Sequence, residues 1–269
     1  MDRHIREFYS VFSDDTPSGN FHKVISLNHE AQLSWEEIVE KVPNLCKGWY
    51  ELAHLSSADR LEFLCDYWLI RMPYHPKLKD FLVTFFSELD DIGVFILQKK
   101  FDDPFTAELV YSRKGGSGFF RGSIGATEEQ LVKLQKEIPD FFLPKDYLSF
   151  LQIHNGFSKT TDCTGIIPCE TMKDTYLDFQ EMVNSLQTVE TTRGELVEPK
   201  ALIPFYESFG MPFFQCFYGE WYPGEEMGNV YYSGLTNTIS DIKDNLTGTE
   251  NMAFATFADW LMFYLENVQ

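Results

Sequence analysis

The chain has 269 residues and a formal net charge of −19, which argues against nucleic acid or an anionic membrane as its partner. Its 44% hydrophobic and 16% aromatic residues are typical of a globular protein with a sizeable core, not of a disordered chain. Five cysteines without a C-x-x-C pair, and a charged N-terminal segment instead of an apolar leader, predict a cytoplasmic protein with reduced thiols.

The first 126 residues are predicted to form helices followed by a three-stranded β-meander. Ser34 and Glu37 have the spacing of a capping box, so a helix is expected to begin after Ser34. Apolar residues at three- and four-residue spacing predict a further helix over 57–72 and another from Pro76 onward. The acidic pairs Asp90–Asp91 and Asp102–Asp103 are interpreted as turn residues. The strands are expected at 92–98, 105–112 and 118–125.

A second unit is predicted over residues 127–269. Thr127 and Gln130 form a second capping box, and the stretch LPKDYLSFLQIHNGF, residues 143–157, is expected to be a short helix that ends at Asn155-Gly156. A longer helix is expected over about 173–187, and a last one after Thr256. The β-prone segments are 166–168, 202–205, 212–218 and 229–234, of which the last two are expected to pair.

The order of these elements resembles the SUKH superfamily, the Smi/Knr-type domain, over about residues 127–269. The similarity lies in a Leu-Pro-x-x-Tyr helix that ends in Asn-Gly, a Gly-led strand that reaches an acidic residue, and an aromatic terminal helix. Family members often have a second glycine where this chain has Phe157, so the loop after the turn is expected to follow a different path. The matching positions are Leu143, Pro144, Tyr147, Phe150, Leu151, Asn155, Gly156, Gly165, Glu170, Ile203, Pro204, Phe205, Tyr231 and Phe257.

The resemblance implies an α+β domain with a mixed sheet flanked by helices. It also implies a non-enzymatic role, either as an immunity protein that binds and neutralises a toxin domain, often a nuclease, or as a regulatory interaction module of the Smi/Knr type. Residues 1–126 match no family by their pattern, and their role stays open.

Enzymatic alternatives rest on few residues. His154 is the only histidine after residue 75, so a Cys-His dyad would need it together with Cys163 or Cys169. A hydrolase that uses converging carboxylates is the other possibility. No calcium-loop or zinc-ligand spacing is present, and no cofactor or metal is predicted. We therefore expect a protein that binds a partner without catalysis.

The charge is concentrated in the second unit, which is expected to attract a basic protein. Up to Ala126 there are 14 basic and 19 acidic residues, a net −5, whereas the rest has 8 and 22, a net −14. The span 201–242 contains no lysine or arginine and is rich in aromatic residues. Within it, the loop GEWYPGEEMG, residues 219–228, is either a surface hot spot or a loop folded onto its own domain. The predicted partner-binding residues are Glu220, Trp221, Tyr222, Glu225 and Glu226.

Overall fold

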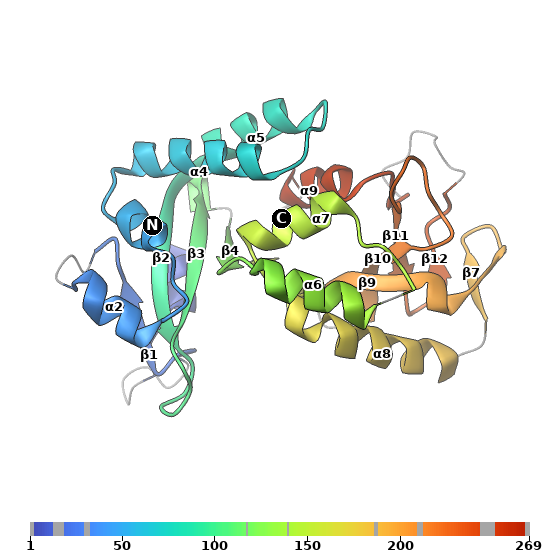
Figure 1. The fold of residues 1–269 in the computed structure, drawn as a ribbon, viewed down its shortest axis with the longest axis horizontal. Helices are drawn as coiled ribbons and strands as arrows, with labels where there is room; N and C mark the ends of the chain where they lie inside the picture. Colours follow the sequence, from blue (N-terminus) through green and yellow to red (C-terminus); the bar gives the residue numbers. More distant parts are fainter. Residues whose placement is uncertain are drawn as a thin grey trace. The chain divides into compact units, whose positions relative to one another are not determined.

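The computed structural model describes residues 3–12, 19–29, 33–116, 118–138, 140–185, 188–208, 212–242 and 251–266. The chain divides into two compact units, both drawn in Figure 1. The N-terminal unit comprises the described residues up to Ile124 together with Glu266, and the C-terminal unit runs from Gly125 to Leu265.

The N-terminal unit contains an antiparallel sheet in the order β1-β2-β3-β4. The predicted meander is confirmed as three of its strands, whereas β1 has no counterpart among the predicted elements. Val24 of β1 pairs with Leu97, and Ser26 pairs with Phe95, so this short segment extends the sheet at the far edge of β2. The strands are β1 (Lys23–Ser26), β2 (Leu89–Gln98), β3 (Thr106–Arg113) and β4 (Phe119–Ser123).

Helices cover both faces of this sheet. On one face, Tyr9 follows α1 and stacks on Phe95 of β2, with 4.4 Å between ring centroids. On the other, Trp68 of α4 donates a hydrogen bond from its indole nitrogen to the hydroxyl of Tyr111, at 3.2 Å. Alternate side chains of a strand point to opposite faces, so a sheet covered on both sides is apolar at every position, as β2 is from Ile92 to Leu97. The helices are α1 (Arg3–Phe8), α2 (Trp35–Lys41), α3 (Lys47–Ala53), α4 (Ser57–Arg71) and α5 (Leu78–Ser87).

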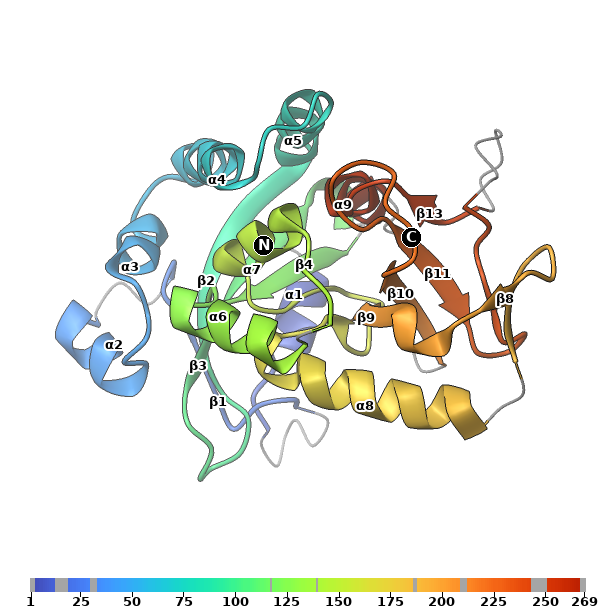
Figure 2. The same cartoon turned by 45° about the vertical axis from the view of Figure 1, so that its right-hand side comes forward.

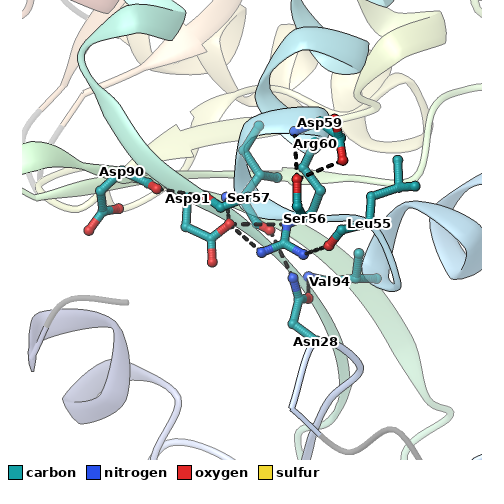
Figure 3. A network of polar contacts seen from close by, with 10 residues as sticks. Asn28, Leu55, Ser56, Ser57, Asp59, Arg60, Asp90, Asp91 and Val94 are labelled. Carbon is teal, nitrogen blue, oxygen red and sulfur yellow. Dashed lines mark hydrogen bonds and ion pairs between the residues drawn. The ribbon is translucent and has the colours of Figure 1, made fainter.

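The interpretation of Asp90 and Asp91 as turn residues is wrong. Both belong to β2, and the register shifts between Leu89 and Asp91, which leaves Asp90 as the extra residue of a β-bulge. Asp91 accepts two hydrogen bonds from the guanidinium of Arg60 in α4, and Ser57 of the same helix donates to the carbonyl oxygen of Asp90 at 2.8 Å (Figure 3). The bulge is therefore one point at which α4 is attached to the sheet, in addition to the Trp68–Tyr111 contact.

The C-terminal unit contains a mixed sheet in the order β5-β6-β9-β10-β11-β12-β7-β8, and β13 pairs with β11. The pairing of β12 with β7 is parallel, and the other pairings in this unit are antiparallel among the described residues. The strands are β5 (Phe157–Lys159), β6 (Gly165–Ile166), β7 (Val189–Thr191), β8 (Leu196–Val197), β9 (Leu202–Glu207), β10 (Phe213–Tyr218), β11 (Asn229–Ser233), β12 (Thr238–Ile239) and β13 (Ala253–Phe254).

Helices lie on the two sides of β9 and β10, and Figure 2 shows α8 and α9 on opposite sides of them. Phe214 of β10 contacts Phe179 of α8 edge to face. Phe217, of opposite parity, contacts Tyr147 of α7, while Phe205 of β9 contacts Trp260 of α9. The predicted α+β fold with a mixed sheet flanked by helices is thus confirmed. The helices are α6 (Glu128–Glu137), α7 (Lys145–Ile153), α8 (Cys169–Ser185) and α9 (Phe257–Glu266).

The Asn-Gly turn after α7 joins this helix to the start of α8. The side-chain carbonyl oxygen of Asn155 accepts a hydrogen bond from the backbone N–H of Cys169 at 2.8 Å, and its amide donates to both carboxylate oxygens of Glu170. Gly156 has φ +103°, which disfavours any side chain. Phe157 begins β5, and its buried ring stacks on His154 with 5.4 Å between centroids. The turn is a structural joint in which Asn155 caps α8.

Replacing Asn155 with alanine is expected to lower the free energy of unfolding by about 1–3 kcal/mol, because the N–H of Cys169 is then left buried without its acceptor. Urea unfolding followed by circular dichroism measures this loss. Asn184→Ala, near the other end of α8, is the matched control and should change stability by much less. Equal losses in the two variants would contradict the capping role.

Candidate partner-binding surface

The loop of residues 219–228 connects β10 to β11 and is closed by backbone hydrogen bonds. The N–H of Tyr218 donates to the carbonyl oxygen of Gly228 at 3.0 Å, and that of Gly228 donates to Trp221 at 2.9 Å. The Trp221 ring lies against Gly228, where a Cβ would stand 2.4 Å from a ring carbon. Trp221 is half-buried and packs on the core cluster around Val230, whereas Tyr222 is 51% exposed. Trp221 thus holds the loop to its own domain, and Tyr222 is its outward aromatic residue.

The carboxylates of this loop face different neighbours. Glu226 accepts a hydrogen bond from the backbone N–H of Lys145, the first residue of α7, at 3.0 Å, and its other oxygen lies 3.8 Å from the Lys145 ammonium group. Glu226 therefore supplies an acceptor to the N-terminus of α7, whose N-cap residue Pro144 provides none. Glu220 accepts a hydrogen bond from the hydroxyl of Tyr218 at 3.0 Å, and Glu225 is exposed.

Glu220 lines a groove at the edge of the sheet that the sequence pattern did not indicate. The groove lies between the end of α8 and the strands β7 and β8, and β8 pairs with β7 at the end of the strand order. Leu196 of β8, which lines the groove, is 73% exposed. We call this surface the acidic groove, and its lining residues are Val183, Asn184, Thr188, Val189, Leu196, Val197, Glu198, Pro199 and Glu220.

Further carboxylates lie close to two tyrosines that neighbour Glu198 and Glu220. Burial raises the pKa of Tyr176, and the nearby carboxylates of Asp140 and Glu198 raise it further. The pKa of Tyr218 is raised by burial, by its hydrogen bond with Glu220 and by the charge of Glu195. These acids come from separate segments and converge only in the fold, which is why a scan for clustered carboxylates along the chain misses them.

A second set of acids follows the exposed side of α8. Asp174, Asp178 and Glu181 recur at three- and four-residue spacing and are exposed, and Leu177 between them is 52% exposed. Their spacing is visible in the sequence once residues 173–187 are predicted to be helical, so this stripe could have been found. Together with the acidic groove it presents carboxylates interrupted by single apolar side chains.

The residues proposed for a thiol-dependent enzyme are in unsuitable surroundings. Burial raises the pKa of Cys169 to about 12, so its thiol stays protonated at neutral pH. His154 is 0% exposed and lies between the aromatic rings of Phe150 and Phe157, where no substrate can reach it. Cys163 is exposed on the segment between β5 and β6. The arrangement of Cys169 and His154 is that of core residues.

Two further properties concern only the described part of the chain. No three histidine, cysteine, aspartate or glutamate side chains in the described ranges come together in a way that could hold a metal ion. No helix among these residues is both long and apolar enough to cross a membrane.

The mixed sheet between α8 on one side and α7 and α9 on the other, with the Asn155 turn joining α7 to α8, defines the C-terminal unit as an α+β domain of the SUKH type. The model of the SMI1/KNR4 family (SUKH-1) matches residues 125–262, and the chain belongs to this family. No curated protein matches the sequence. SUKH domains are generally non-enzymatic immunity or regulatory proteins.

Proposed function

We propose that this protein is an immunity protein, which binds a basic toxin domain through the acidic groove and the adjoining loop of residues 219–228. Membership in the SUKH-1 family supports a binding role. The observation that carries the proposal is the composition of the acidic groove. The exposed Leu196 lines the groove together with the buried residues Val183 and Val189. The carboxylates of Glu198 and Glu220 line the same groove.

The partner is expected to be basic because the lining of the acidic groove contains no cation. A cationic surface would be steered toward it by long-range attraction, and Leu196 and Tyr222 would supply apolar contact area. A nuclease toxin fits this chemistry, since carboxylates can occupy the positions of phosphates on its active surface. Nucleic acid and anionic membranes would be repelled by the same charges.

In this proposal, the five predicted partner-binding residues have different roles. Glu220, Tyr222 and Glu225 are available to a partner, whereas Trp221 and Glu226 also support the loop. A Trp221 or Glu226 variant that loses binding would therefore be ambiguous, because the substitution also removes contacts that hold the loop in place. Glu198 and Glu220 are the better probes.

The test begins with a search of the neighbouring genes for a toxin domain. A candidate toxin is then co-expressed with this protein to measure rescue of cell growth, and the two purified proteins are titrated by calorimetry. Glu198→Lys with Glu220→Lys should weaken binding by about a hundredfold or more and abolish rescue, because two attractive charges become repulsive. The matched control is Glu36→Lys with Glu40→Lys, two exposed acids of α2 that give the same change in net charge.

Full rescue by the Glu198→Lys/Glu220→Lys protein would overturn the proposed surface. Binding of the toxin without any protection of the cell would overturn the immunity role and favour a regulatory scaffold of the same family. Rescue lost in Cys163→Ala or His154→Ala, with toxin binding retained, would instead favour the hydrolase alternative.

A further inference from the structure

Helix α4 in the N-terminal unit is apolar on two sides. Its buried side contains Leu64, Cys65 and Trp68, which pack toward the sheet and α5. Arg60 on the same side is only 7% exposed and is held by Asp91 of β2 and the carbonyl oxygen of Leu55 (Figure 3). These contacts fix the rotation of the helix about its own axis. The exposed side chains of the helix therefore also have a defined direction, which is into solvent.

The exposed part of the helix surface carries large apolar side chains. Phe63 is 51% exposed and Ile70 is 81% exposed, and the Tyr67 ring between them stacks on Phe63 with an interplanar angle of 6°. Tyr74, three residues after Arg71 at the end of the helix, is 93% exposed. A contiguous exposed apolar surface marks an interaction site. We call Phe63, Tyr67, Ile70 and Tyr74 the α4 stripe.

The spacing within the α4 stripe is that of a helix-pairing seam. Phe63, Tyr67 and Ile70 are separated by four and three residues, so Phe63 and Ile70 take heptad position d and Tyr67 takes position a. Asp66 then falls at position g and Arg71 at position e of the next heptad, and both are exposed. In a parallel pair of helices, positions g and e are the ones that form ion pairs between the two chains.

The charges beside the α4 stripe are complementary to a second copy of themselves. Asp66 of one copy would meet Arg71 of the partner subunit, and the two-fold symmetry of a dimer would form this ion pair twice. The Arg71 guanidinium already lies 5.4 Å from the Tyr67 ring centroid, at the flank of the stripe. The exposed acids Glu62 and Asp66 make the same face unfavourable for an anionic membrane. We propose that the α4 stripe is the contact between two copies of this chain, paired through parallel α4 helices.

The first measurement is the mass of the full chain in solution by sedimentation velocity over a wide range of concentrations. We expect a concentration-dependent dimer of the 31.3 kDa chain. Ile70→Asp places a charge in the seam and should raise the dimer dissociation constant at least about tenfold. Leu177→Asp, at a leucine of α8 that is 52% exposed, is the matched control and should leave the dimer unchanged. Circular dichroism checks that both variants remain folded.

Charge reversal tests the pairing itself. Asp66→Arg and Arg71→Glu should each weaken the dimer, and the double variant should restore it, because the attraction between the two copies is re-formed with the signs exchanged. The parallel direction is tested with Ile70→Cys in a Cys46→Ser/Cys163→Ser background, which should give a disulfide-linked dimer on oxidation, since parallel pairing places position 70 opposite itself.

Three results would overturn the proposal. The first is that the chain is monomeric at every concentration. The second is that Ile70→Asp leaves the dimer dissociation constant unchanged. The third is that the Asp66→Arg/Arg71→Glu protein dimerises more weakly than either single variant. A monomer that instead binds to vesicles or to another protein through Ile70 would also reject a second copy as the occupant.

Discussion

Replacing Arg60 with alanine is expected to lower the free energy of unfolding by about 3–5 kcal/mol, because the Asp91 carboxylate would be left buried without its cation. The Arg60 and Asp91 side chains are 9% and 14% exposed. Arg60 donates to Oδ1 of Asp91 from Nε at 3.0 Å and from Nη2 at 2.6 Å, and Nη1 donates to the carbonyl oxygen of Leu55. One side chain thus ties the start of α4 to the bulge of β2.

The loss can be measured by urea denaturation, with hydrogen exchange of the α4 amides to assign it to the N-terminal unit. Lys79→Ala is the matched control, because it removes the same charge from an exposed position of α5 and should cost less than about 0.5 kcal/mol. Arg60→Met combined with Asp91→Leu should cost less than Arg60→Ala alone, since no unpaired charge remains. Equal stability of the Arg60→Ala and Lys79→Ala proteins would show that the pair does not hold α4.

The elements that could be predicted from the sequence are those set by neighbouring residues. The capping box of Ser34 and the one of Thr127 both form as predicted, and Thr256 accepts a hydrogen bond from the N–H of Asp259 at the start of α9. In each case the donor and acceptor are three residues apart, so the local sequence contains the whole interaction. The pairing of β10 with β11 was predicted for a similar reason, because only a short loop separates them.

The features that were missed depend on residues far apart in the chain. Strand β1 has only four residues and is held by pairing with the end of β2, about seventy positions later. Aspartate is a residue type that is common in turns, but Asp91 lies in strand β2. Its side chain there accepts hydrogen bonds from Arg60, 31 residues earlier. The acidic groove combines Glu198 with Glu220 across two strands, and the bond from Lys145 to Glu226 spans 81 residues. A pattern of neighbouring residues cannot indicate contacts between residues so far apart in the sequence.

The Leu-Pro-x-x-Tyr helix contains one such long-range residue, Asp146. Its Oδ2 accepts a hydrogen bond from the N–H of Ala258, in the first turn of α9, at 2.9 Å, and its Oδ1 accepts one from the N–H of Tyr147 at 2.9 Å. The side chain is 9% exposed. Asp146 therefore joins α7 to the N-terminus of α9 and is removed from water to do so.

Burial raises the pKa of Asp146 from 3.8 to about 6, although the hydrogen bonds from Ala258 and Tyr147 favour the charged form. The folded state therefore holds a proton that the unfolded chain releases between about pH 4 and pH 6. Protonated Asp146 therefore stabilises the folded state. This contribution is fully present below the unfolded pKa of 3.8, and it is lost as the pH rises through the folded pKa of about 6. A shift of this size corresponds to about 3 kcal/mol.

Asp146→Asn is expected to remove this pH dependence, since the amide does not titrate and its oxygen can still accept the N–H of Ala258. The measurement is the urea midpoint and free energy of unfolding between about pH 4 and pH 7 for both proteins. Relative to the variant, the original protein should lose about 3 kcal/mol of unfolding free energy across this range.

Asp174→Asn removes an exposed carboxylate of α8 and serves as the control for the change in net charge. Parallel pH profiles for the original and Asp146→Asn proteins would mean that hydrogen bonds from α9 offset the burial of the carboxylate. The hydrogen bonds from Ala258 and Tyr147 would then balance the cost of desolvation at the joint between α7 and α9.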